Sequence, residues 1–246
     1  MSATFWPYTI DGSGHLLEDS HRLRYQAYCL DRKFLSAENY PNQMELDDFD
    51  RFSVHVGVVD AEGELAGTAR IVKHSSVGLP LFRHCTLFPH ETRLDDVANT
   101  VVEISRVCIS RPYARRRADV CVDGPEVEPE EPPILPHERR HRDAVFIALI
   151  KATYQASKRL GATHWIVAME KPLLRRTARL GVPFRVAGPE VDYYGLVAPY
   201  IMNLAEFDQM ILGGRIAMLG DFLHGLEPEF WPTLDEHDAP LCPTPG

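Results

Sequence analysis

Residues 100 to 109 read Thr-Val-Val-Glu-Ile-Ser-Arg-Val-Cys-Ile, and they form the most informative segment of the chain. The β-branched residues are typical of a strand, and three polar residues interrupt a run that is otherwise largely apolar. A side-chain period of two puts Glu103 and Ser105 on one face, about 7 Å apart, and Arg106 on the other. Ionised groups in a central strand are costly to bury unless they are paired. The segment therefore indicates either a structural ion pair or a functional site.

The flanking segments alternate between strand and helix patterns. Residues 54–60 and 65–73 are rich in β-branched residues and flank a turn, which predicts an antiparallel hairpin. Further strands are expected at residues 163–170, 184–186 and about 194–203. Helices are expected from Ser20 to Phe34, from Asp143 or just after Pro136 to Gly161, and from Pro172 to Gly181. This order predicts an α/β fold with a mixed central sheet and helices on both faces, in three layers.

The composition is that of a globular protein with one main domain. The 246 residues are 45% hydrophobic and 25% charged, which excludes disordered and fibrous classes. Residues 123–136 are rich in proline and glutamate and have little to bury, so we expect a mobile insertion there. The domain is expected to span residues 1–226, followed by a loose tail at 227–246.

Net charge, hydropathy and cysteine spacing argue against nucleic-acid binding, a membrane span and a Cys-x-x-Cys metal or redox site. The 35 acidic residues against 26 Lys and Arg give a net charge of -9, so the chain as a whole repels nucleic acid. The first residues show no cationic stretch followed by an apolar run, and no window approaches about 20 apolar residues, so we expect a cytoplasmic protein without a membrane span. The five cysteines are scattered and lack a Cys-x-x-Cys unit, which favours reduced, buried thiols.

Several charged residues are candidates for a site. Asp47, Asp48 and Asp50, preceded by Glu45, form an acidic cluster that either binds a cation or cationic substrate or is simply solvated. Arg70 lies within a predicted strand and needs a partner, whereas an exposed Arg24 on its helix needs none. Residues 137–141 match the His-Glu-x-x-His zinc pattern, but no third ligand is marked, so we expect a basic helix start and no metal.

Arginines gather in two further clusters on either side of the acidic insertion. In a chain of net charge -9 such clusters suggest a bound phosphate or an acidic protein partner, unless glutamates of the insertion neutralise them. The residues are Arg111, Arg115, Arg116, Arg117, Arg139, Arg140 and Arg142.

Taken in order along the chain, the polar residues resemble the signature of acyl-homoserine lactone synthases and N-acyl amino acid synthases. The signature residues are Arg24, Tyr28, Phe34, Glu45, Asp47, Asp50, Arg70, Glu103, Ser105 and Arg106. The closer likeness is to the acyltransferases associated with PEP-CTERM and exosortase systems. It rests on residues 23–30 (Leu-Arg-Tyr-Gln-Ala-Tyr-Cys-Leu), His164-Trp165, Met169-Glu170 and Leu180-Gly181, and the resemblance covers about residues 20 to 205.

The resemblance implies a GNAT-type fold and an enzyme that moves a fatty acyl group from a thioester to the amine of an amino acid or similar molecule. It implies no tightly bound cofactor, and a donor carried by acyl carrier protein or coenzyme A. By the same resemblance, Glu103, Asp47 and Asp50 bind or deprotonate the amine, and Ser105 contacts the acceptor or thioester. Arg70 and Arg106 hold the acidic residues, and the helical lid and substrate contacts come from Arg24, Tyr28, Phe34 and Met169.

The sequence departs from the signature at two places, and these departures bear on the product and on the acyl donor. Phe34 stands where lactone synthases usually have Trp, and no Gly-x-Gly/Ala loop follows Arg111. The first leans away from a lactone synthase, and the second leans towards acyl carrier protein as partner. An acetyl-coenzyme A N-acetyltransferase and a non-catalytic module that binds lipid or carrier protein are the remaining alternatives.

The expected chemistry is consistent with these residue types. An amine attacks only when neutral, so near pH 7 it needs a carboxylate to take its proton. The oxyanion that forms needs hydrogen-bond donors, which a bulged strand can offer.

Overall fold

The computed structural model describes residues 5–91, 99–113, 136–193, 195–213 and 222–232, with side chains of the third range from residue 143. The predicted insertion at 123–136 and most of the predicted tail lie outside these residues, apart from Pro136 and residues 227–232. The elements, in order, are β1 (Trp6–Thr9), α1 (Gly14–Tyr25), β2 (Ser53–Val59), β3 (Leu65–Lys73), β4 (Val101–Ile109), α2 (Pro136–Arg159), β5 (His164–Met169), α3 (Lys171–Arg179), β6 (Arg185–Val186), β7 (Val191–Asp192), β8 (Leu196–Asn203) and α4 (Leu204–Leu212).

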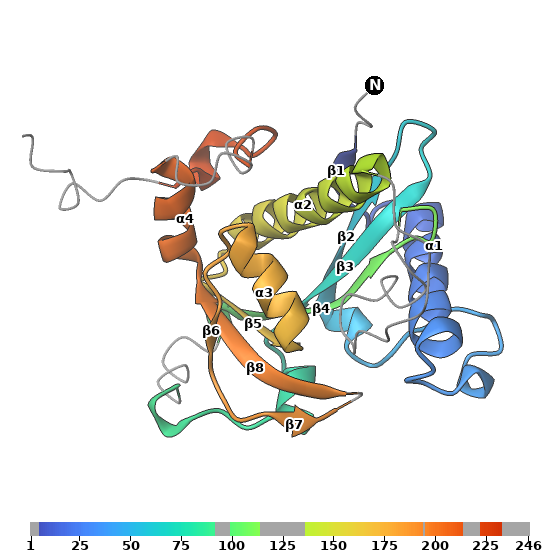
Figure 1. Ribbon diagram of the computed structural model, residues 1–246, viewed down its shortest axis with the longest axis horizontal. Coiled ribbons are helices and arrows are strands. Elements are labelled where there is room, and N and C mark those ends of the chain that lie inside the picture. Colours follow the sequence, from blue (N-terminus) through green and yellow to red (C-terminus); the bar gives the residue numbers. More distant parts are fainter. Residues whose placement is uncertain (1–4, 92–98, 114–135, 194, 214–221, 233–246) are drawn as a thin grey trace, which may run out of the picture.

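The strands form one mixed sheet in the order β1-β2-β3-β4-β5-β8-β6, and β7 pairs with β8 (Figure 1). Neighbouring strands are antiparallel except β4 and β5, which are parallel. The β4–β5 ladder ends at Glu103 and Ile166, although β4 continues to Ile109 and β5 to Met169. The two strands therefore part in the middle of the sheet, beside the polar residues of β4.

Helices cover both faces of the sheet, as predicted. Helix α2 packs over β1 to β4, and its Leu149 and Tyr154 share a buried cluster with Val56 and Ala69 of β2 and β3. On the other face, α1 and a π-helical segment at Gln26–Asp31 follow β3 and β4, with Tyr28 against Cys108 (Figure 1). The two faces differ because side chains alternate along each strand.

The structure shows where the first helix and the long helix α2 begin. The first helix begins at Gly14 after Ser13, so the expected cap at Ser20 is wrong; the Ser20 hydroxyl instead donates to the Leu17 carbonyl. Helix α2 begins at Pro136, where a proline fits the first turn, and not at Asp143, which pairs with Arg176.

Three elements were not predicted from the sequence. They are β1, β7 and α4, which are short or lie at an edge of the sheet. Within the described residues, no helix is both long and apolar enough to span a membrane.

Candidate active site

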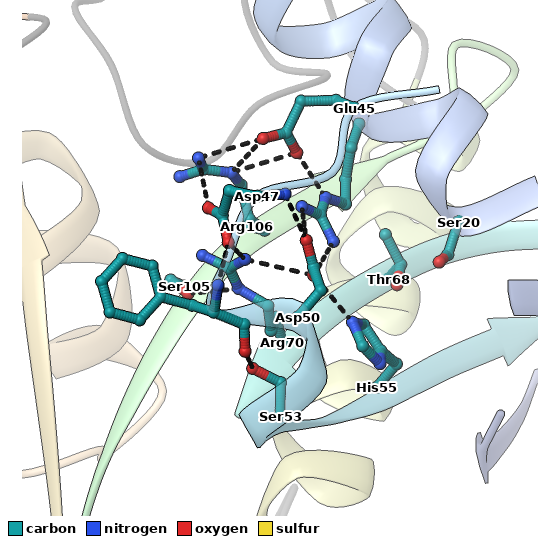
Figure 2. Close-up of polar contacts among 12 residues, drawn as sticks. Ser20, Glu45, Asp47, Asp50, Ser53, His55, Thr68, Arg70, Ser105 and Arg106 are labelled. Carbon is teal, nitrogen blue, oxygen red and sulfur yellow. Dashed lines mark hydrogen bonds and ion pairs between the residues drawn. The ribbon is translucent and has the colours of Figure 1, made fainter. Parts of the chain in front are cut away.

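Three arginines from three elements pair with three carboxylates of the segment before β2. Figure 2 labels two of the arginines, Arg70 and Arg106, and all three carboxylates, Glu45, Asp47 and Asp50. Arg24 of α1 donates from Nε to Glu45 at 2.6 Å and grips both oxygens of Asp50, with Nη1 at 2.6 Å and Nη2 at 3.0 Å. The loop is tied to α1 because the Glu45 amide donates to the His21 carbonyl. Arg24 is 1% exposed, so the expected surface arginine is instead an internal anchor.

Arg70 and Arg106 complete this frame from β3 and β4. Arg70 Nη1 donates to Asp47 at 2.6 Å and to Asp50 at 3.1 Å. Arg106 Nη2 donates to Glu45 at 3.1 Å and to Asp47 at 3.2 Å. We call these six residues the Arg–carboxylate frame: Arg24, Glu45, Asp47, Asp50, Arg70 and Arg106.

Opposite charges balance in the frame, which is what permits its burial. Burial alone would raise the pKa of Glu45, but the guanidinium groups of Arg24 and Arg106 outweigh it and lower that pKa to about 2. Burial also acts to raise the pKa of Asp50, yet hydrogen bonds from His55 and Arg24 hold it well below its usual range. Both carboxylates are therefore ionised at neutral pH, as acceptors for the arginines.

A bulge in β4 brings Ser105 and Arg106 to the same side of the sheet. The register with β3 shifts between Thr68 and Arg70, and Arg106 has a φ of 54°. The expectation from period two, that Arg106 lies on the opposite face from Ser105, is therefore wrong, because a bulge resets the alternation. Ser105 Oγ accepts a hydrogen bond from Arg70 Nε at 3.2 Å.

Glu103 is not part of the frame, and its pKa is raised well above the ordinary value of a glutamate. It is 5% exposed, and its carboxylate accepts from the Leu81 amide at 2.7 Å. That amide opens a short 3-10 turn at Pro80–Arg83, where an N–H has no partner within the turn. Burial raises the pKa of Glu103 to about 7, although the Leu81 bond and the charges of Arg70 and Arg106 oppose the rise. Near neutral pH the group is poised between acid and base.

A cavity of about 50 Å³ opens on Glu103, on the frame side of β4. Tyr28 and Phe34 lie on one wall with ring centroids 6.3 Å apart, and the Tyr28 ring also lies against the Arg106 guanidinium. Tyr193 stacks on His84 at 3.8 Å between centroids. The lining residues are Tyr28, Phe34, Pro80, Glu103, Ile104, Ser105, Arg106, Ala168, Tyr193 and Val197.

A second cavity, of about 60 Å³, lies under α2 and α3 and is almost wholly apolar. Met169 lines this cavity and not the one at Glu103, so the structure separates it from the other expected substrate contacts. Ile104 lines both cavities, and each cavity includes residues from the part of β4 and β5 where the ladder has ended. The lining residues are Ala69, Ile104, Val107, Phe146, Leu149, Ile150, Thr153, Trp165, Val167, Met169, Leu173, Thr177, Val182 and Phe184.

The structure supports some of the expected residue roles and not others. Tyr28 and Phe34 line the cavity, as a lid would, whereas Arg24 lies in the frame below it. Asp50 is saturated by Arg24, Arg70 and the Asp47 amide, so it has no capacity left for a substrate amine. Asp47 is 26% exposed at its side chain and remains open to solvent.

Most residues of the two arginine clusters lie outside the part of the chain that the structure describes. Arg111 is exposed and pairs with Asp31 at 2.5 Å, so it is already engaged. Of the other six, Arg115, Arg116 and Arg117 lie outside the described residues, and so do the side chains of Arg139, Arg140 and Arg142.

One group of metal-ligand residue types occurs within the described ranges. His21, Asp50 and His55 place one possible ligand atom each within 4.8 Å of one another. Arg24 and Arg70 already donate to Asp50, and their charge opposes a divalent cation there. We assign no metal to this group.

Several contacts could not be found from sequence. The Leu81 amide and Tyr193 reach the site from distant loops. His55 contacts the frame through Asp50, and Asp11 in turn contacts His55. The local signals in the sequence were the acidic cluster of Glu45, Asp47 and Asp50 and the charged or polar residues that interrupt the strand patterns, Arg70, Glu103, Ser105 and Arg106.

Comparisons with known proteins agree on the fold. A family model described as an acetyltransferase (GNAT) domain matches residues 23–122. FeeM, an N-acyl amino acid synthase from uncultured soil microbes, is a structural neighbour with 12% identity and a TM-score of 0.56, covering 87% of this chain and 98% of that chain. No curated protein matches the chain.

Two further neighbours are acyl-homoserine lactone synthases. BjaI, which is coenzyme A-dependent and was solved with SAM and isopentyl-CoA, has 16% identity and a TM-score of 0.57, covering 95% of this chain and 96% of that chain. LasI has 12% identity and a TM-score of 0.52, covering 95% and 97%. The chain thus has the GNAT-type fold predicted from its sequence, and its neighbours include both enzyme groups that the signature resembles. The likeness to PEP-CTERM-associated enzymes stays a prediction.

Proposed function

We propose that the protein is an N-acyltransferase that moves a fatty acyl group from a thioester to the amine of an amino acid or similar small molecule. The observation that supports this most is Glu103. A buried carboxylate with a pKa raised to about 7, facing a cavity, has the properties of a general base. The GNAT-type fold and the two enzyme groups among its neighbours support the same reaction class.

In the proposed reaction, the amine nitrogen attacks the thioester carbonyl carbon. An ammonium ion has no lone pair, so Glu103 takes one proton from it before the neutral amine attacks. As the C–S bond breaks, the attacking nitrogen loses a second proton, which goes to the leaving thiolate, and the amide and a free thiol are formed. The proton held by Glu103 is then released to solvent. No covalent acyl-enzyme is needed, because the amine is itself the nucleophile.

Ser105 is proposed to stabilise the oxyanion. Its Oγ accepts from Arg70 Nε, so its own O–H remains able to donate to the developing negative charge. Ser105 and Glu103 lie two residues apart on β4 and line the same cavity, and the bulge adds Arg106 to its lining. Donors held in place before the reaction cost little reorganisation.

The Arg–carboxylate frame is proposed to hold the acceptor side of the cavity in shape. Asp47 is the member with exposed surface, so we assign it to the ammonium form of the arriving amine. Asp50 is assigned a structural role, which differs from the role that the resemblance implied, because its acceptors are occupied.

The apolar cavity under α2 and α3 is proposed to hold the acyl chain. Fatty chains are driven into such sites by removal of apolar surface from water. Ile104 separates this cavity from the one at Glu103, so a thioester carbonyl between the parted strands would have its chain on one side and the amine on the other.

Acyl carrier protein is proposed as the donor's carrier, on the strength of the arginine clusters. These clusters are basic in a chain of net charge -9, and carrier proteins generally present acidic surfaces. Lactone synthesis and acetyl transfer are the rival activities, and product analysis separates them.

Mass spectrometry of lipid extracts tests the proposal. Cells that express the wild-type chain, the Glu103→Gln variant or an empty vector are compared. We expect a new N-acyl amide with the wild-type chain and a loss of about 10²-fold or more in the variant. A lactone product, or an amide made equally by a folded Glu103→Gln variant, would overturn the proposed reaction or the role of Glu103.

A further inference from the structure

His55 of β2 lies behind the Arg–carboxylate frame, with its imidazole between two carboxylates. Its Nδ1 is 2.8 Å from Asp11 Oδ1, and its Nε2 is 3.0 Å from Asp50 Oδ1 (Figure 2 shows the second contact). The residue is 4% exposed, and its cross-strand neighbour is Arg70. The Asp11 carboxylate also accepts from the His55 backbone amide, at 3.0 Å.

The chemistry of these contacts fixes the charge of the ring. An ionised carboxylate only accepts hydrogen bonds, and a neutral imidazole has a single N–H. Two carboxylates at hydrogen-bond distance from both ring nitrogens therefore require two N–H donors, which is the imidazolium form. Burial alone would lower the pKa of His55, but the hydrogen bonds to Asp11 and Asp50 outweigh it and raise that pKa.

We propose that His55 is a positioning residue: held as an imidazolium by Asp11, it fixes Asp50 and, through Asp50, the arginines that shape the acyl-transfer site. This inference rests on the proposed function for the meaning of that site. Asp50 Oδ1 receives His55, Arg24 at 2.6 Å and Arg70 at 3.1 Å.

Loss of the second ring proton would disturb this arrangement directly. An imidazole that keeps its proton on Nδ1, for Asp11, would turn a lone pair on Nε2 toward the lone pairs of Asp50 Oδ1. Asp50 would move or rotate, and Arg70 would lose one of its two carboxylate partners. Because Arg70 also donates to Ser105, the effect would reach the proposed oxyanion donor.

The other titratable and charged groups near His55 do not favour its protonation. His21 of α1 lies edge-on to it at 5.5 Å between centroids, and burial together with Arg24 lowers the pKa of His21 to about 4, so that ring is neutral at pH 7. Like burial, the charge of Arg24 acts to lower the pKa of His55, and Arg70, the cross-strand neighbour, carries the same charge. Among the described residues, Asp11 and Asp50 are the groups whose hydrogen bonds favour the imidazolium.

Nitrogen NMR of the full-length chain with ¹⁵N-labelled histidine tests the charge state. We expect both His55 ring nitrogens to show imidazolium shifts at pH 7.5, well above the ordinary titration of histidine at about 6.5. The His55→Gln variant assigns the signal by its disappearance. A neutral His55 at pH 7.5, or a ring that binds added Zn²⁺ in place of the second proton, would overturn the proposal.

Asp11→Asn tests the positioning role without changing the frame itself. It removes one of the two carboxylates, so the His55 titration should move to lower pH, and the basic limb of kcat/KM for acyl transfer should move with it. Asp19→Asn, an exposed aspartate on α1, is the matched control and should leave both unchanged. The side-chain N–H signals of Arg24 follow Asp50 in the same titration and require no enzyme assay.

The two readouts separate the proposals. If the His55 and Arg24 signals shift together in Asp11→Asn while the wild-type chain shows no acyl transfer, the positioning proposal stands and the proposed function fails. If the Arg24 signals and the activity profile stay unchanged while His55 titrates earlier, His55 does not position Asp50 and the inference is wrong.

Discussion

Replacing Glu103 with glutamine should stabilise the protein at neutral and alkaline pH. Glu103 is buried, and its pKa is raised from about 4.5 to about 7, chiefly by burial. The folded chain therefore holds a proton that the unfolded chain has already released between these two pH values. By linkage, wild-type stability falls as the pH rises through this window.

The size of the effect follows from the shift. One pKa unit corresponds to about 1.4 kcal/mol, so the difference between pH 4.5 and 7 amounts to about 3 kcal/mol as an upper estimate. Glutamine keeps a carbonyl oxygen for the Leu81 amide and carries no charge. The advantage of Glu103→Gln over wild type should therefore grow across this range and stay constant above pH 8.

Urea denaturation at half-unit steps from pH 4 to 8.5 measures the difference. Glu91→Gln is the control, because Glu91 is also buried but pairs with Arg185, and it should lose stability where Glu103→Gln gains it. If wild type and Glu103→Gln keep the same difference in unfolding free energy at every pH, Glu103 has an ordinary pKa. The proposed base would then be refuted.

Three other substitutions probe the frame, the amine contact and the donor. Arg24→Ala leaves buried carboxylates without their cation and should cost about 3 to 5 kcal/mol in urea denaturation; a loss below about 1 kcal/mol would contradict the buried frame. Asp47→Asn should raise KM for the amine more than it lowers kcat, and steady-state kinetics with a varied acceptor would show the reverse if Asp47 does not bind the ammonium. Reversal of Arg115 and Arg116 to Glu should lower the rate with acyl carrier protein far more than with a short acyl-pantetheine thioester, and increasingly so at low salt. Arg179→Glu serves as the control, and equal losses on both donors would rule out docking.

The sequence predicted most of the sheet because strand patterns depend on local periodicity. The hairpin, the strand at 101–109, β5 and β8 all have β-branched or apolar runs that the structure confirms. The strands β1 and β7 have four and two residues, too few for a period to emerge. Helix α4 is as long as α3, and its signals, a cap at Asn203 and Gly213 after its end, were left out of the sequence-based prediction.

The structure brings six of the residues singled out in the sequence into contact as the Arg–carboxylate frame, but the sequence did not predict how they pair. A list of polar residues does not reveal which charges cancel, and the pairing of Arg24 with Glu45 and Asp50 depends on the way the loop folds back. The bulge at Arg106 also broke the two-residue rule that assigned its face. The two-residue period does not predict which face a side chain occupies once a bulge has added a residue to the strand.

The most direct test of the central claim is the pH dependence of acyl transfer by the purified protein. With an acyl-pantetheine donor and a panel of amino acids, kcat/KM for wild type should rise through a limb with a pKa of about 7, the value of Glu103. For the Glu103→Gln variant, kcat/KM should be lower by about 10²-fold or more, and its pH profile should lack this limb. A folded variant that keeps both the rate and the limb would show that Glu103 does not take the amine proton.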